Sequence, residues 1–167
     1  MQIHKNVSYT ATHVIRFRQR LTKPQLQTLM QKLDAYIEQQ NAKKTDDVIT
    51  AIHTMYLDDG TSDIEMFVAI NKAIPSTKSF TYMPKFELTN CIMFSYKGYS
   101  HLVPEAYTKL YHIAKGMGLE INPPFYNVSD GQMIGLWENG EVEMDVYVKA
   151  NTVNTFEKPQ YVTLCTE

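Results

Sequence analysis

One segment of the sequence carries acids and an aromatic residue at alternate positions. In residues 141–151, Glu143, Asp145 and Tyr147 alternate with apolar side chains. Successive side chains of a β-strand point to opposite faces, so these three would share one face. A carboxylate that faces aromatic rings can hold an organic cation by charge and by stacking. Burial could instead raise the pKa of the carboxylate and make it a general acid or base.

A second segment has the same pattern. Residues 59–71 place Glu65 and Phe67 on the face opposite a run of apolar residues. We also expect Tyr96 and Trp137 to reach a ligand, because tyrosine and tryptophan combine a large apolar ring with a polar group. The alternative is that the acids only face water, as on most antiparallel sheets, and that the rings belong to the core.

These segments belong to an internal repeat. Residues 12–33 align without a gap on residues 89–110, and residues 59–71 align on residues 139–151. Few positions are identical, but the aligned elements follow one another in the same order in both halves. Self-similarity of this kind indicates that each copy is one supersecondary unit.

Each half has the pattern strand, helix, strand, strand. In the first half, Thr22, Pro24 and Gln25 form a capping box with a proline in the opening turn, which predicts the start of a helix. The dipeptide Asp59-Gly60 is a strong signal for the hairpin between the last two strands.

The sequence therefore predicts one α+β domain over residues 1–167. It would consist of two repeats, about 7–71 and 86–151, followed by a C-terminal extension at 152–167. The two modules would form a pseudo-twofold antiparallel sheet with helices on one side. The acid-bearing faces would lie on the free side and converge on a central groove.

Four short motifs follow one another in a recognisable order: Lys97-Gly98-Tyr99, Ala106-Tyr107, Asn122 to Tyr126, and Asp145 to Val148. With them, the chain resembles the GyrI-like small-molecule-binding domain family in its standalone form. The resemblance implies the duplicated fold and a pocket between the halves for organic molecules, often aromatic and cationic. In many members this domain is the effector-binding part of a multidrug-responsive transcription activator, and the resemblance implies a bacterial protein of that kind.

Two positions depart from the family pattern. The family usually has glutamate where this chain has Asp145, and it often has proline near Lys149. The carboxylate is therefore one methylene shorter, and a lysine on the same face could neutralise it. Both departures bear on the selectivity for cations.

Composition limits the partners. Net charge is −2, hydrophobic residues make up 44%, and no long run has one sign of charge, so we expect no direct nucleic-acid contact and no membrane partner. We expect a cytoplasmic location and no preceding DNA-binding module, because no signal peptide or helix-turn-helix pattern is visible. The histidines and cysteines lack metal-ligand spacing and no nucleotide-binding glycine motif occurs, so we expect no metal and no cofactor.

Three hypotheses for function follow. In the first, the protein senses or sequesters an aromatic, cationic or amphipathic ligand, with Asp145, Glu65 and Glu143 supplying charge. In the second, it hydrolyses a reactive electrophile: the carboxylate of Asp145 would activate water, and Tyr147 would donate a hydrogen bond or a proton. In the third, it acts on a protein partner, as an inhibitor of DNA gyrase or as a subunit of a regulator. The sequence leaves the oligomeric state open.

Overall fold

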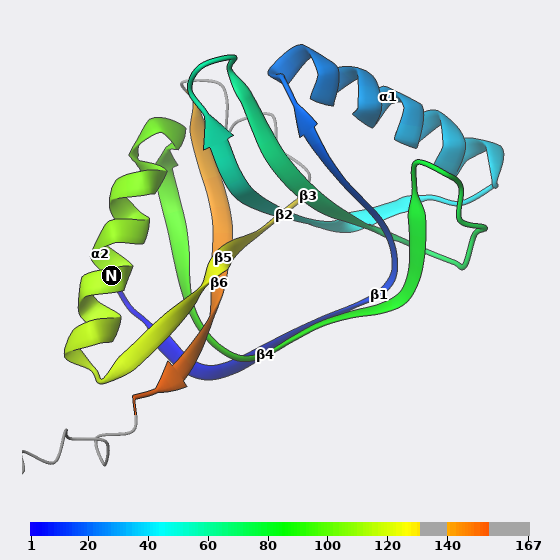
Figure 1. The fold of residues 1–167 in the computed structure, drawn as a ribbon. Helices are drawn as coiled ribbons and strands as arrows, with labels where there is room; N and C mark the ends of the chain where they lie inside the picture. The colour runs from blue at the N-terminus through cyan, green and yellow to red at the C-terminus, as the bar shows by residue number, and fades with distance from the viewer. Residues whose placement is uncertain (131–139, 154–167) are drawn as a thin grey trace, which may run out of the picture.

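The computed structural model describes residues 1–130 and 140–153, without the side chain of Asp46. The expected Trp137 and most of the expected C-terminal extension therefore lie outside the described residues. Within them the chain runs through strand–helix–strand–strand twice (Figure 1). The elements are β1 (His4–Leu21), α1 (Lys23–Gln39), β2 (Lys44–Tyr56), β3 (Thr61–Ile70), β4 (Thr81–Tyr99), α2 (Val103–Gly116), β5 (Leu119–Ser129) and β6 (Glu141–Thr152).

The strands form a closed antiparallel barrel in the order β1-β3-β2-β5-β6-β4. This α+β fold confirms the expected class but not a sheet with one free face. Strands β1 and β4 are 18 and 19 residues long and pair with each other as well as with their own neighbours. They run side by side along one edge of the molecule in Figure 1 and close the sheet on itself. The face away from the helices is therefore the interior of the barrel.

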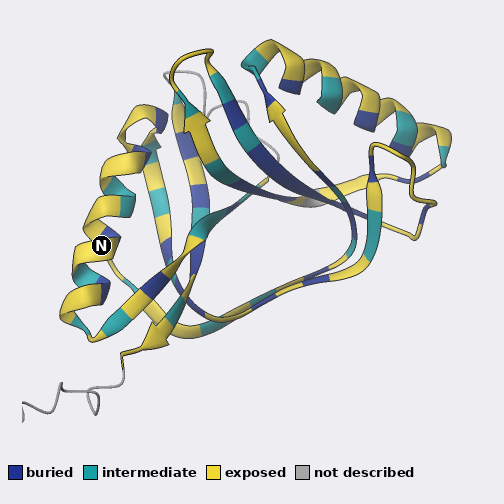
Figure 2. Ribbon diagram, in the orientation of Figure 1, coloured by how far each residue is buried: buried dark blue, intermediate teal, exposed yellow. Residues whose placement is uncertain are grey.

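Both helices pack on the outside of the barrel. The apolar stripe of α1, including the fully buried Leu33, meets the face of β3 that carries Met66 and Val68. The stripe of α2, including Leu110, meets Val146 of β6 and its neighbours. Figure 2 shows buried residues on the sides of both helices that face the sheet. The apolar faces of the two acid-bearing strands are therefore helix-packed core, as the alternation predicted. Fully burying a leucine contributes about 2–3 kcal/mol.

Local signals in the sequence set several boundaries correctly. Thr22 caps α1: its Oγ1 accepts from the backbone N–H of Gln25, whose side chain accepts from the backbone N–H of Thr22. Gly60 has φ +67° in the β2–β3 turn, a left-handed conformation that glycine adopts at little cost. Among the described helices, none combines the length and hydrophobicity needed to cross a bilayer.

Two pairs of left-handed residues match the internal repeat. His13 and Asn90 have φ of 55° and 53°, and they are 77 positions apart, the spacing at which the two halves align. Asn41 and Gly118 have φ of 54° and 72° just beyond the two helices, again 77 positions apart. These matching left-handed positions support a duplication of one unit. The duplication and its pseudo-twofold symmetry stay predictions.

We expect Gly118→Ala to lower the free energy of unfolding by about 1–2 kcal/mol, because a left-handed backbone is strained for alanine. A Cβ at Gly118 would meet no atom within 4 Å, so the cost would be purely conformational. Gly116→Ala is the matched control, because Gly116 also has free space but lies in the last helical turn without positive φ. Urea unfolding of both variants should show a loss only for Gly118→Ala. Equal losses would contradict the conformational explanation.

Tyr107 on α2 gives a pH-dependent prediction. Its hydroxyl donates to Asn127 Oδ1, and burial raises its pKa far above the usual value near 10. The unfolded chain therefore loses this proton at a lower pH than the folded one, so stability falls as pH rises past about 10, by up to about 1.4 kcal/mol per pH unit. We expect Tyr107→Phe to reduce this slope in urea unfolding between pH 9 and 11. Tyr111→Phe, at an exposed tyrosine of the same helix, should keep the wild-type slope.

Candidate functional site

The two acid-bearing strands face the same interior. Strands β2 and β5 pair with each other and separate β3 from β6. The register brings the expected site residues into two rows across these four strands: Glu65, Ala51, Tyr126 and Tyr147 in one row, and Phe67, Ile49, Val128 and Asp145 in the other. Each acid of one half thus shares a row with the aromatic residue of the other half.

The middle of this interior is filled by side chains. Phe67 and Tyr147 are 4% and 8% exposed and belong to one apolar cluster. The ring of Phe67 lies 4.2 Å from that of Phe86, and Tyr147 lies 5.4 Å from Tyr9, between ring centroids. The faces meet as the sequence predicted, but their aromatic residues pack against each other. Barrel closure explains this, because β1 and β4 bring further apolar side chains such as Phe86 onto the same face.

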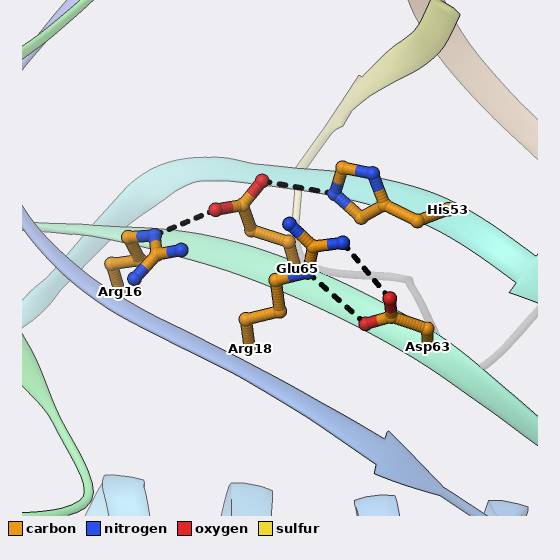
Figure 3. Close-up of polar contacts among 5 residues, drawn as sticks. All are labelled: Arg16, Arg18, His53, Asp63 and Glu65. Atoms are coloured by element: carbon orange, nitrogen blue, oxygen red, sulfur yellow. Dashed lines mark hydrogen bonds and ion pairs between the residues drawn. The ribbon is translucent and has the colours of Figure 1, made fainter.

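Glu65 is buried and its charge is already paired. Its Oε2 accepts from Arg16 Nε at 2.6 Å, and its Oε1 lies 3.1 Å from His53 Nε2. Figure 3 shows the carboxylate between these two side chains. The neighbouring Asp63 is held by Arg18 through both oxygens, and Arg18 keeps the pKa of this carboxyl below its usual range. We infer that Glu65 stabilises the barrel. Its negative charge is already paired with Arg16 and is therefore not available to a cationic ligand.

Asp145 accepts a hydrogen bond from a neutral side chain, whereas Glu65 accepts one from Arg16. It is half-buried, and Ser95 Oγ donates to its Oδ1 at 2.6 Å. Among the described residues it takes part in no ion pair, and this includes Lys149, whose expected neutralising contact is not formed. Within the part of the chain that the structure describes, no basic side chain therefore pairs with its carboxylate.

Asp145 lines an open cavity of about 460 Å³ where β5 ends and β6 begins. We call this cavity the acidic hollow. Its described lining contains four carboxylates and one lysine: Asp47, Asp130, Glu143, Asp145 and Lys97. Glu143 is highly exposed, and its carboxylate lies 3.8 Å from the ammonium of Lys97. The hollow therefore carries excess negative charge.

Aromatic rings adjoin these carboxylates. Tyr9 donates its hydroxyl to Asp47 Oδ2 at 2.7 Å, and its ring contacts Tyr147. Burial, together with the negative charge of Asp145, raises the pKa of Tyr147, so this phenol stays protonated at neutral pH. Tyr96 also lines the hollow, while its ring packs against the core under α2 and its hydroxyl donates to the carbonyl of Tyr99. The hollow thus brings together the expected Asp145, Glu143 and Tyr96, and their role in ligand binding stays a prediction.

Sequence reasoning missed Asp47 and Ser95. Asp47 lies in the polar run 43–47 at the start of β2, where no alternation points to a site. Ser95 lies opposite Asp145 only because β4 pairs with β6. Both residues are recognised as part of the candidate site only in the folded structure, where they lie near residues distant in the sequence. Within the described residues, no group of three or more potential ligands could hold a metal ion.

Comparison with known proteins gives a fold likeness only. No protein-family model and no curated protein matches the chain. Among solved structures, the crystal structure of the EcmrR C-terminal domain matches with a TM-score of 0.61 at 13% identity, covering 92% of this chain and all of that one. An uncharacterized conserved protein from Listeria innocua matches with a TM-score of 0.56 at 7% identity, covering 88% and 93%.

EcmrR also matches in a cryo-EM structure of its DNA complex, with a TM-score of 0.61 at 12% identity over 90% of this chain. This chain spans 58% of the length of that EcmrR chain. Identities this low show a shared fold and leave the function of this chain to its own site. The chain has the fold of the EcmrR C-terminal domain, a GyrI-like fold, as the sequence motifs led us to expect.

Proposed function

We propose that this protein binds a small organic cation with an aromatic part in the acidic hollow, and so senses or sequesters it. The observation that carries the proposal is the half-buried carboxylate of Asp145, which has a serine but no described basic partner. A unit charge about 4 Å from a carboxylate gains roughly 4 kcal/mol at an effective dielectric constant of 20, before desolvation costs. The cavity volume is within the usual range for ligand sites.

The surrounding residues define the roles within the site. Asp145 and Asp47 would supply the charge, and Glu143 at the exposed rim would steer the cation inwards. The partly exposed Tyr9 and Tyr96, with the buried Tyr147 behind Tyr9, would supply the aromatic surface. In this arrangement Tyr147 holds the wall in place more than it contacts the ligand.

Two further points support a sensing role. The sequence motifs resemble those of GyrI-like domains, which bind small organic molecules and often regulate transcription. The fold is shared with the C-terminal domain of EcmrR, a protein whose structure was solved in complex with DNA. A domain of this kind would store its ligand or report its presence to a protein partner. The absence of direct nucleic-acid contact and the cytoplasmic location stay predictions.

Isothermal titration calorimetry with three naphthalene compounds tests the proposal. The (2-naphthylmethyl)trimethylammonium ion, 2-naphthol and 2-naphthoate share one ring system and differ in charge. We expect the cation to bind, the anion to give no heat, and the cation affinity to fall with added salt, because exposed charges are screened. Equal affinity for cation and anion would contradict the proposal.

The same approach separates binding from hydrolysis. Samples incubated with a panel of aromatic cations and electrophilic esters are analysed by mass spectrometry after hours at neutral pH. We expect every ligand mass to stay unchanged over the incubation. A product mass that accumulates with the wild type and not with Asp145→Asn would instead support the hydrolase hypothesis.

A further inference from the structure

A second cavity lies outside the barrel, between the end of β2 and the start of α2. Its volume is about 310 Å³, and we call it the α2 cavity. Met55 of β2, Val103 of α2 and Phe125 of β5 provide apolar walls. The ring of Phe125 stacks on that of Tyr107 with centroids 4.2 Å apart and planes 1° apart, which makes one wall flat and aromatic.

The polar groups of the α2 cavity are few and neutral or basic. Asn127 is only 1% exposed, and its Oδ1 accepts from the hydroxyl of Tyr107. His53 reaches the cavity from the end of β2 while its Nε2 contacts the buried Glu65. No carboxylate is among the described residues that line the cavity. An apolar cavity with a few fixed polar groups is the usual form of a small-molecule site.

The two cavities are lined by different residues of β5. Phe125 and Asn127 line the α2 cavity, whereas Val128 and Ser129 line the acidic hollow. The α2 cavity shares no lining residue with the acidic hollow. It therefore has neither the charge nor the position to hold the cation proposed above.

We propose that the α2 cavity is a second binding site, which takes a neutral aromatic molecule of about two fused rings with one hydrogen-bonding group. The flat wall of Tyr107 and Phe125 favours a planar ring, and His53 and Asn127 offer partners for a hydroxyl or amide. An apolar cavity of about 150 Å³ takes up benzene, so a space of about twice that volume fits a bicyclic molecule. A cation gains no charge pairing there.

Methyl NMR with 2-naphthol tests the second site. Met55 lines the α2 cavity and Val128 lines the acidic hollow, so the methyl groups of these two residues report on the two sites separately. Met55→Leu and Val128→Ile assign the two sets of signals. We expect 2-naphthol to shift the Met55 methyl saturably, to leave the Val128 methyl groups unchanged, and to show intermolecular NOEs to Met55.

Thr54→Trp provides the blocking variant, because Thr54 is exposed and lines the cavity. The indole would occupy the space, and we expect the affinity for 2-naphthol to fall at least about tenfold. Thr108→Trp, the same substitution on the outer face of α2 away from the cavity, should bind as the wild type does. A Met55 signal that does not move up to the solubility limit, or a Thr54→Trp variant with wild-type affinity, would overturn the second site.

This test is independent of the proposed function. Asp145→Asn should leave the 2-naphthol titration of Met55 unchanged, because Asp145 is not part of the α2 cavity. If Asp145→Asn weakened the binding of 2-naphthol as much as that of the cation, one shared site would replace the two proposed here. If the cation failed to bind, the 2-naphthol titration would still decide by itself whether the second site exists.

Discussion

Replacing Glu65 by alanine is expected to lower the free energy of unfolding by about 2–3 kcal/mol while the affinity for an organic cation stays unchanged. Glu65 is 8% exposed and is the common partner of Arg16 and His53. Its removal leaves the guanidinium of Arg16 and the imidazole of His53 without their acceptor. Because the side chain of Arg16 remains 34% exposed, water offsets part of the cost of a fully buried unpaired charge.

Urea unfolding and calorimetry on the same preparations measure both halves of this prediction. Asp63→Ala is the control, because Asp63 accepts from Arg18 in the same way but both side chains are more exposed. We expect it to cost no more than about 1 kcal/mol. A stable Glu65→Ala variant that has lost cation binding would show that Glu65 is a ligand residue and that our structural interpretation of it is wrong.

Replacing Asp145 by asparagine is expected to weaken the binding of the naphthyl cation about tenfold, or about 1.4 kcal/mol, and Asp145→Lys by more than a hundredfold. Asparagine keeps an oxygen that can accept from Ser95 but removes the charge. Lysine would add a positive charge, which repels the cation, to a hollow that already contains Lys97. The neutral 2-naphthol should lose no affinity in either variant.

The matched control is Asp34→Asn, which removes the same charge from an exposed ion pair between α1 and Lys44. It should bind the cation as the wild type does, because Asp34 does not line the acidic hollow and its exposed charge is screened by salt. Thermal unfolding of all variants must show a folded protein. Unchanged cation affinity in both Asp145 variants would place the binding site elsewhere.

Local physical signals made much of the fold predictable from the sequence. The capping box at Thr22 and the turn at Gly60 depend only on neighbouring residues, and both are present as expected. The alternation around Met66 and Val146 assigned the helix-packed faces correctly, because a strand with one apolar face has only one stable orientation toward the core.

Barrel closure was not predictable in the same way. The sequence placed the two repeats at about 7–71 and 86–151, whereas in the structure β1 begins at His4 and β4 at Thr81. These extra residues pair with the inner part of the other strand, as His4 does with Met93 and Thr81 does with Arg16, and they lengthen the seam that closes the barrel. Pairing between distant segments leaves no periodic signal in the sequence. The same reason explains why Phe67, expected in an open groove, is packed against Phe86.

The candidate site was only partly predictable. Alternation identified Asp145 and Glu65 as equivalent acids, and the repeat made them look alike. Their environments differ because Arg16 on β1 lies opposite Phe67 and reaches Glu65, whereas Ser95 on β4 lies opposite Asp145. A single arginine on a neighbouring strand thus decides which of the two carboxylates stays available for a ligand.

The most direct measurement of the central claim is a methyl NMR titration with the (2-naphthylmethyl)trimethylammonium ion. Val128 lines the acidic hollow and lies opposite Asp145 on the neighbouring strand, and Met55 lines the α2 cavity. We predict a saturable shift of the Val128 methyl groups that is lost in Asp145→Lys, with the Met55 methyl unmoved. A saturable shift of Met55 with Val128 unmoved, or no shift of either, would contradict cation binding in the acidic hollow.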